Sequence, residues 1–194
     1  METDGKKYDV IYADPPWNYV TWSIKGNGRS AERHYRTMDI QRLTDMDIGQ
    51  LCNKDCILLM WATFPCLTQA LKLGEAWGFT YKTVAFTWIK VNRGNNGYFM
   101  GMGYYTRSNA EVVLLFTKGK PLARLRRDIR QLVAEPRLRH SQKPRSIRKL
   151  IVELFGDRPR LELFARENDD RELFRGWDVY GDEISGSITI HSKE

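Results

Sequence analysis

The sequence predicts an α/β fold, with a mostly parallel sheet and helices on both of its faces. Apolar runs of strand length alternate along the chain with amphipathic segments of helix length. Several runs, such as 8–13 and 56–61, are apolar at almost every position, as in strands covered on both faces. With 194 residues, 42% of them hydrophobic, the chain can bury one substantial core, so we expect a single domain over residues 1–194.

The strands of the predicted sheet follow from these apolar runs. We expect strands at residues 8–13, 56–61, 79–90, 110–117, 160–165 and 177–180. A glycine-rich stretch at residues 93–103 separates the third and fourth strands and predicts a mobile loop.

The predicted helices are bounded by residues that start or stop a helix. One is expected at 40–51, and a second at 67–77, where Gly78 stops it. A third runs to Phe155 and ends at Gly156, with Ser141 as its N-cap and Pro144 tolerated in its first turn.

The composition excludes several classes of protein. No run of 18 apolar residues and no signal-like amino terminus is present, so we expect no membrane association and a cytoplasmic protein. The three cysteines lack Cys-x-x-Cys spacing, and the three histidines are scattered. This pattern favours buried thiols over zinc ligands or disulfides, and we expect no metal site.

The positive charge is concentrated in one part of the chain. Residues 118–149 contain twelve Lys or Arg against two acidic residues, a local charge of +10 in a chain of net charge +7. Such a segment suits a surface that follows a nucleic-acid backbone, although a solvated helix face gives the same pattern.

The tetrapeptide Asp14-Pro15-Pro16-Trp17 directly follows the first strand, at the edge where open α/β sheets bind ligands. It combines a carboxylate, a carbonyl held by two stiff residues, and an aromatic face. Asp14 and the Pro15 carbonyl could accept the two N–H groups of an exocyclic base amine, and Trp17 could stack on the base. A strand terminator with a core tryptophan remains the alternative.

Two long segments near this tetrapeptide mix glycine with aromatic and basic residues, at 18–36 and 93–107. Stacking groups beside cations suit a flipped base and its flanking phosphates, although glycine-rich loops often have no such role. We single out Arg33, His34 and Tyr35 as substrate-binding candidates. Asn109 and Glu111, at the start of the fourth strand, are candidates for orienting the substrate.

The order of these features resembles the MT-A70 family of S-adenosylmethionine-dependent adenine-N6 methyltransferases over nearly the whole chain. Five stretches carry the resemblance, at residues 13–17, 34–38, 58–63 with 77–79, 140–144, and 161–166 with 176–177 and 181–183. It implies a Rossmann-like methyltransferase fold in permuted order, with Asp14-Pro15-Pro16-Trp17 ahead of most cofactor-binding elements. The chain also lacks the Gly-x-Gly-x-x-Gly of dinucleotide-binding enzymes.

The resemblance implies S-adenosylmethionine as cofactor and direct transfer of its methyl group to adenine N6, with no metal and no covalent enzyme intermediate. Asp14 would accept from the cofactor ammonium as well as from the target amine. The other cofactor-binding residues implied by the resemblance are Lys143, Phe164, Arg166, Asn168, Asp182 and Glu183. Asp182 departs from the family, which often has an uncharged amide there. Trp61 is interpreted as core packing.

The resemblance leaves the polymer open between DNA and RNA. Because little beyond a catalytic core is present, DNA is favoured, by analogy with bacterial or phage enzymes. Asp14-Pro15-Pro16-Trp17 alone does not separate adenine N6 from cytosine N4. The alternatives are an RNA adenine-N6 methyltransferase or an inactive nucleic-acid-binding subunit, and the protein could work as a homodimer or with a partner subunit.

Overall fold

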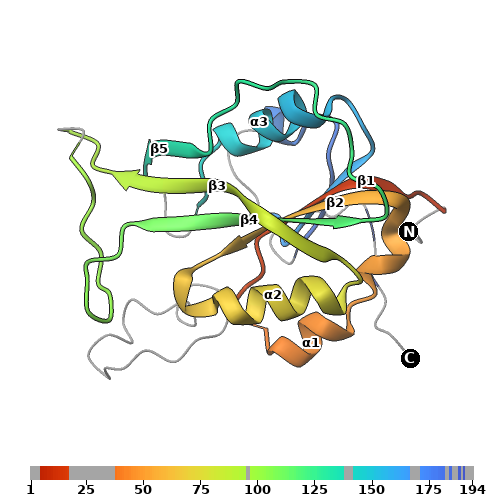
Figure 1. Cartoon of the computed structure of the whole chain (residues 1–194), viewed down its shortest axis with the longest axis horizontal. Helices are drawn as coiled ribbons and strands as arrows, with labels where there is room; N and C mark the ends of the chain where they lie inside the picture. Colours follow the sequence, from red (N-terminus) through yellow and green to blue (C-terminus); the bar gives the residue numbers. More distant parts are fainter. Residues whose placement is uncertain are drawn as a thin grey trace.

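The computed structural model describes residues 5–17, 38–94, 97–137, 142–166 and 171–181, and also residues 184, 188 and 190. Within these residues the chain forms a central sheet with helices packed on both sides (Figure 1). The strands are β1 (Tyr8–Ala13), β2 (Cys52–Ala62), β3 (Thr80–Val91), β4 (Ala110–Lys118), β5 (Leu132–Pro136), β6 (Arg160–Leu163) and β7 (Asp178–Tyr180). The α-helices are α1 (Ile40–Asp45), α2 (Leu67–Ala76) and α3 (Ser146–Phe155).

The seven strands are ordered β5-β3-β4-β2-β1-β6-β7. Four neighbouring pairs are parallel, namely β1 with β2, β1 with β6, β3 with β5 and β6 with β7. Strand β4 runs antiparallel to both of its neighbours, β2 and β3. The prediction of a mostly parallel sheet is therefore confirmed.

Each face of the sheet carries its own hydrophobic core. On one face, Leu58 and Met60 of β2 pack in a cluster with Leu43 of α1 and Leu73 of α2. On the other face, Leu59 and neighbouring strand residues pack with the buried side of α3. Figure 1 shows α1 and α2 together on one side of the sheet and α3 on the opposite side. Helices cover both faces, as predicted, because successive residues of each strand point to opposite faces.

The predicted helix at 40–51 is wrong in extent. Helix α1 ends at Asp45, and Met46 has extended backbone angles (φ −66°, ψ 125°). A separate 3₁₀ turn then covers Ile48–Leu51. Met46, Ile48 and Leu51 are all buried in the core, so the chain breaks its helix to bury three apolar side chains that one helix would not direct to the same side.

Two further elements differ from the predictions. Strand β5 was not predicted, because it is short, lies at the sheet edge, ends in Pro136 and buries only Val133 of its five residues. Helix α3 begins at Ser146 with Arg145 at its N-cap position, so the prediction of Ser141 as N-cap is wrong, and Pro144 lies before the helix. Its end is as predicted, since Gly156 follows Phe155 with φ of 80°.

Some simpler predictions can also be compared with the structure. Cys52, Cys56 and Cys66 are buried free thiols, as expected. Across the described residues, no helix combines the length and the apolar character needed to cross a membrane.

Candidate active site

The Asp14-Pro15-Pro16-Trp17 loop leaves the carboxyl end of β1, in the middle of the sheet. The chain continues from β1 to β2 on one side, and β6 lies on the other side. The strand order therefore reverses beside β1, which is where open α/β sheets form a ligand crevice. The Asp14 backbone N–H donates to the Leu163 carbonyl of β6 at 3.4 Å, and its carboxylate is one-fifth exposed.

The backbone of the loop is fixed by its own hydrogen bonds. The Trp17 N–H donates to the Pro15 carbonyl at 2.8 Å, and the Met38 N–H donates to the Pro16 carbonyl at 3.0 Å. A carbonyl oxygen has two lone pairs, so Pro15 keeps one for a further donor. Because proline also fixes φ, the direction of this carbonyl is set before any ligand binds.

Trp17 is buried, with 6% of its surface exposed, and its indole N–H donates to the Trp61 carbonyl at 3.1 Å. It packs in the same core cluster as Leu43 and Met60. Trp17 therefore anchors the loop to β2, and its predicted stacking on a base stays a prediction.

Lys143 joins the site from the segment that precedes α3. Its ammonium lies 2.9 Å from Asp14 Oδ1 and 3.4 Å from Glu111 Oε2. It also lies 5.4 Å from the centre of the Trp61 ring, within the range of a cation–π contact. The structure thus brings together three residues that sequence analysis predicted separately: Asp14, Lys143 and Glu111.

Glu111 is the second carboxylate of this cluster, and it stands between two ammonium groups. Lys90 of β3 contacts Glu111 Oε1 at 2.5 Å, while Lys143 approaches Oε2. Burial raises the pKa of the Glu111 carboxyl, but Lys143 and Lys90 outweigh it and hold that pKa below its ordinary value of 4.5. Glu111 therefore carries a negative charge at neutral pH and keeps the Lys143 ammonium in place.

Lys90 was not predicted, although the sequence holds a signal for it. Strands 79–90 and 110–117 are consecutive, and an antiparallel pairing places the end of the first beside the start of the second. The observed register pairs Ile89 with Ala110, next to Lys90 and Glu111. A lysine and a glutamate at these two strand ends are therefore expected to meet.

A buried polar network lies next to the site and includes residues of β1, β2, β6 and α3. The Trp61 indole N–H donates to the Tyr12 hydroxyl at 2.5 Å. Arg148 of α3 forms a bidentate pair with Glu162 of β6, and its guanidinium lies 5.7 Å from the centre of the Tyr12 ring. Trp61 is buried as predicted, and it also contacts both the Trp17 indole and the Lys143 ammonium.

The end of β6 lies beside the Asp14 loop, on the side of β1 away from β2. Phe164 has φ of 62°, a left-handed conformation that costs energy for a residue other than glycine. Its ring meets Tyr180 edge-on at 6.4 Å, and the next N–H, of Ala165, donates to the Tyr180 carbonyl at 2.9 Å. A Cβ on Gly181 would lie 2.0 Å from the Ala165 carbonyl, so only glycine allows this approach. Such strain is typical of functional sites.

Six predicted site residues lie outside the described part of the chain. They are Arg33, His34, Tyr35, Asn168, Asp182 and Glu183. Arg166 is half-buried directly after Phe164 and Ala165, and Asn109 accepts the Lys90 backbone N–H at 2.9 Å. Arg166 therefore lies just beyond the end of β6, and Asn109 lies beside Lys90 at the start of β4.

Among the described residues of 118–149, the basic side chains do not form one surface. Lys143 and Arg148 are mostly buried in the site, and Arg126 pairs with Asp128 and Glu153. Arg124, Arg127 and Arg130 are exposed in the stretch between β4 and β5. In the described residues, no group of three or more His, Cys, Asp or Glu is arranged to hold a metal ion.

The arrangement suits a zwitterionic ligand at the end of β1. Asp14 offers a carboxylate to a ligand ammonium, and Lys143 offers an ammonium to a ligand carboxylate. The two groups now neutralise each other at 2.9 Å, so a ligand that carries both charges could insert between them without leaving either unpaired.

Comparison with known proteins identifies the family of this chain. The Type II methyltransferase M.MunI of a Mycoplasma species is 40% identical over 195 residues, which cover 92% of this chain and 78% of that protein. The N(6)-adenine-specific methyltransferase METTL4 of Mus musculus and a probable N(6)-adenosine-methyltransferase MT-A70-like protein of Oryza sativa subsp. japonica are both 28% identical, and each match covers 93% of this chain. The matched region spans 38% of the mouse protein and 23% of the rice protein. Residues 8–183 match the MT-A70 family, and the chain belongs to that family.

Proposed function

We propose that this protein transfers the methyl group of S-adenosylmethionine to the N6 amine of adenine in DNA. The observation that carries the proposal is the Asp14–Lys143 pair at the carboxyl end of β1, the strand that lies between β2 and β6. This pair would offer opposite charges to the cofactor and, through Asp14, an acceptor to a base amine at the same point of the sheet. Family membership supports the same class of enzyme.

The residues around Asp14 and Lys143 suit S-adenosylmethionine. The amino-acid part of the cofactor has an ammonium for Asp14 and a carboxylate for Lys143. Phe164 and Arg166, which follow the end of β6, would border the methionine and ribose portions of the cofactor. The bound cofactor supplies an electrophilic methyl group, while the protein supplies position and electrostatics.

The base amine needs activation, because the lone pair of adenine N6 is delocalised into the ring. Two acceptors that hold its N–H groups favour a pyramidal nitrogen with an available lone pair. Lys143 contacts one oxygen of Asp14, and a carboxylate has two oxygens with lone pairs for further donors. The Pro15 carbonyl, whose direction is fixed by the Pro15–Trp17 hydrogen bond, is the second acceptor.

Two facts favour DNA over RNA as the polymer. The Type II methyltransferase M.MunI is 40% identical to this chain. The relatives named as adenosine methyltransferases are less similar, with 28% identity for the rice protein. RNA methylation and an inactive nucleic-acid-binding subunit are the competing functions.

The test is transfer of a labelled methyl group. The purified protein is incubated with methyl-labelled S-adenosylmethionine and, separately, with duplex DNA free of N6-methyladenine, the same DNA as single strands, and RNA. Each polymer is then digested to nucleosides. Label in N6-methyldeoxyadenosine supports the proposal, and label only in N6-methyladenosine from RNA contradicts the choice of DNA. Cofactor binding without methyl transfer to any polymer favours a missing partner. The absence of both cofactor binding and methyl transfer favours an inactive subunit.

A further inference from the structure

Between β3 and β4 the chain forms a narrow hairpin, residues 97–109, which we call the arm. It begins where Tyr98 bridges to Val91, and the Phe99 N–H donates to the Lys90 carbonyl at 2.8 Å. Farther out, the Gly101 N–H donates to the Ser108 carbonyl at 2.9 Å. Figure 1 shows the arm at one end of the molecule, beyond the ends of β3 and β4.

Two glycines allow the legs of the arm to approach each other closely. A Cβ on Gly101 would lie 2.3 Å from the Ser108 carbonyl oxygen, and one on Gly103 would lie 2.0 Å from the Thr106 carbonyl oxygen. Both distances are far shorter than any real contact to backbone. The arm is therefore a tightly closed structure with a defined shape.

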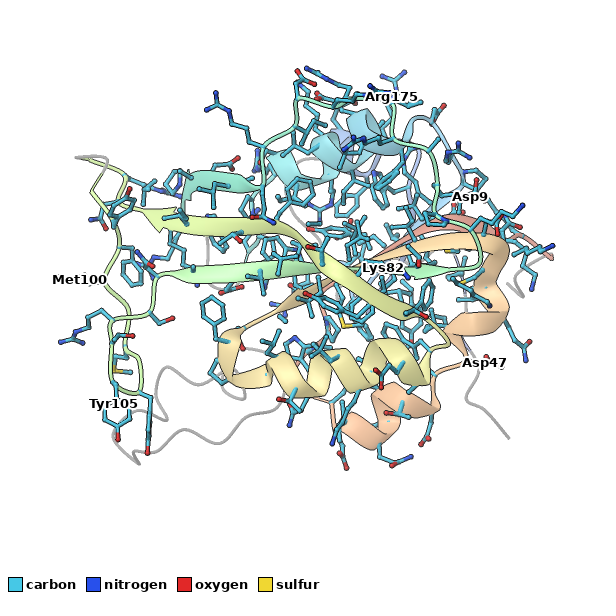
Figure 2. The ribbon with its side chains drawn as sticks, in the orientation of Figure 1. Asp9, Asp47, Lys82, Met100, Tyr105 and Arg175 are labelled. Atoms are coloured by element: carbon cyan, nitrogen blue, oxygen red, sulfur yellow. The ribbon has the colours of Figure 1, made fainter. Side chains whose placement is uncertain are left out.

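The arm presents large apolar side chains to solvent. Tyr98, Met100, Met102, Tyr104 and Tyr105 are between 63% and 93% exposed. Tyr98, Met100 and Met102 alternate with the less exposed residues between them, as on one face of an extended segment. Figure 2 shows Met100 and Tyr105 on the arm, well away from the body of the protein. Apolar side chains gathered on so small an element mark an interaction site.

The arm starts beside the candidate active site. Its second leg ends at Asn109 and continues directly into β4, whose second residue is Glu111. Glu111 contacts Lys143, which in turn contacts Asp14. A molecule held by Asp14 and extending past the end of the sheet would therefore meet the arm.

The charges around the arm suit a polyanion. Residues 97–109 include Arg107 and no acidic residue. At the base, the Arg137 guanidinium lies 3.5 Å from the centre of the Phe99 ring, and Arg93 donates to the Arg137 carbonyl at 3.2 Å. All three arginines are exposed, and none of them forms a salt bridge with a carboxylate in the part of the chain that the structure describes.

A second copy of the chain is a less suitable partner for this surface. A two-fold interface between two arms would bring positive charge from both copies together, and residues 97–109 contain no acidic residue to pair with it. Aromatic rings and thioethers next to exposed guanidinium groups instead match stacked bases flanked by phosphates.

We propose that the arm inserts into the DNA beside the target adenine, where Tyr104 and Tyr105 stack on the neighbouring bases and keep the adenine out of the helix. This inference rests on the proposed function. Tyr104 and Tyr105 lie at the turn of the arm, with their rings nearly perpendicular and 4.9 Å apart. Without these rings, no stacking contacts would offset the free-energy cost of unstacking the adenine.

The test compares paired and already unpaired target adenines. The wild-type protein first methylates duplex DNA, and the modified site is mapped. Duplexes carrying that site are then made with the target adenine either paired or opposite an abasic position. The variant is Tyr104→Ala with Tyr105→Ala. The control is Leu125→Ala, which removes an apolar side chain that is 64% exposed and lies outside the arm, beside the end of α3.

We expect the double variant to lower kcat/KM on the paired duplex by about tenfold or more, and by much less on the abasic duplex, since base stacking on a tyrosine is worth roughly that factor. Leu125→Ala should match the wild type on both. Equal losses on the two duplexes, or no loss on either, would overturn the proposal. The proposal would also be overturned if light scattering showed a dimer for the wild type and a monomer for the double variant, with transfer per chain changed equally on both duplexes. The arm would then bind a protein partner instead. No methylation of duplex DNA by the wild type would instead contradict the proposed function.

Discussion

Lys143 Nζ lies 2.9 Å from Asp14 Oδ1, which joins the loop after β1 to the segment before α3. The ammonium also contacts Glu111, so one cation holds two carboxylates of the candidate active site. Asp14 follows the carboxyl end of β1, and Glu111 lies near the start of β4, which runs antiparallel to β2. The end of β1 and the start of β4 therefore lie at the same end of the sheet, where Lys143 contacts both residues.

Lys143→Met should weaken binding of S-adenosylmethionine by about 10- to 100-fold, the usual cost of one charge-assisted hydrogen bond. The substitution keeps most of the side-chain volume and removes the cation that would pair with the cofactor carboxylate. Isothermal titration calorimetry measures the effect. Lys149→Met is the matched control, because Lys149 is 80% exposed on α3. Equal affinities for the wild type and Lys143→Met would remove Lys143 from the cofactor site.

Glu111→Gln should destabilise the protein at neutral pH, by about 1–3 kcal/mol, because it leaves Lys90 and Lys143 without their shared carboxylate. The pKa of Glu111 is lowered on folding from 4.5, since the two lysines outweigh the effect of burial. Its stabilising effect is therefore complete above the unfolded pKa and disappears as the pH falls through the lower folded pKa.

Urea unfolding of the wild type and Glu111→Gln, from neutral pH to below pH 4.5, tests this expectation. The difference in unfolding free energy should be largest at neutral pH and should shrink in acid. Glu75→Gln, at an exposed position of α2, should show no such dependence. A difference that stays constant down to the lowest pH would show that the Glu111 charge does not stabilise the fold.

Phe164 provides a prediction about backbone strain. Its φ of 62° is costly for any residue with a Cβ, so Phe164→Gly should be more stable than Phe164→Ala by about 1 kcal/mol. The usual order is the reverse, because glycine loses more chain entropy on folding. Both variants lose the ring contact with Tyr180, so thermal or urea unfolding of the pair isolates the backbone effect. If the alanine variant is the more stable, Phe164 is not strained.

The Arg148–Glu162 pair should be a stability element of the site. Arg148→Met leaves the buried Glu162 carboxyl without its partner and should cost about 3–5 kcal/mol. Adding Glu162→Gln to Arg148→Met should restore a large part of this loss, because the unpaired charge is then removed as well. Urea unfolding of the two single variants and the double variant gives the coupling energy. Additive losses would mean that the two side chains do not stabilise each other.

The sequence predicted the strands well where burial on both faces makes them apolar throughout, as in β1 and β4. It did not predict β5, whose exposed edge carries no such pattern, and it extended α1 through Met46 because apolar spacing alone does not reveal a helix break. The family resemblance and the class of enzyme are confirmed by the family match and the relatives.

Three residues of the observed cluster could be predicted from the sequence, but their contacts could not. Asp14, Lys143 and Glu111 were each chosen from the sequence, whereas their mutual pairing depends on strand order. The contact of Lys90 with Glu111 could have been inferred from the pairing of the two strands, but it was not predicted. The positive φ of Phe164 leaves no trace in the sequence, because a phenylalanine gives no sign of a left-handed backbone.

The most direct test of the central claim is methyl transfer by Asp14→Ala. The variant is assayed with labelled S-adenosylmethionine and the DNA that the wild type methylates, and circular dichroism confirms that it is folded. In our proposal Asp14 accepts from the base amine, so we expect turnover to fall by at least about 100-fold in a folded protein. Near-normal turnover by folded Asp14→Ala would contradict the assignment of Asp14 as the group that orients and activates adenine N6.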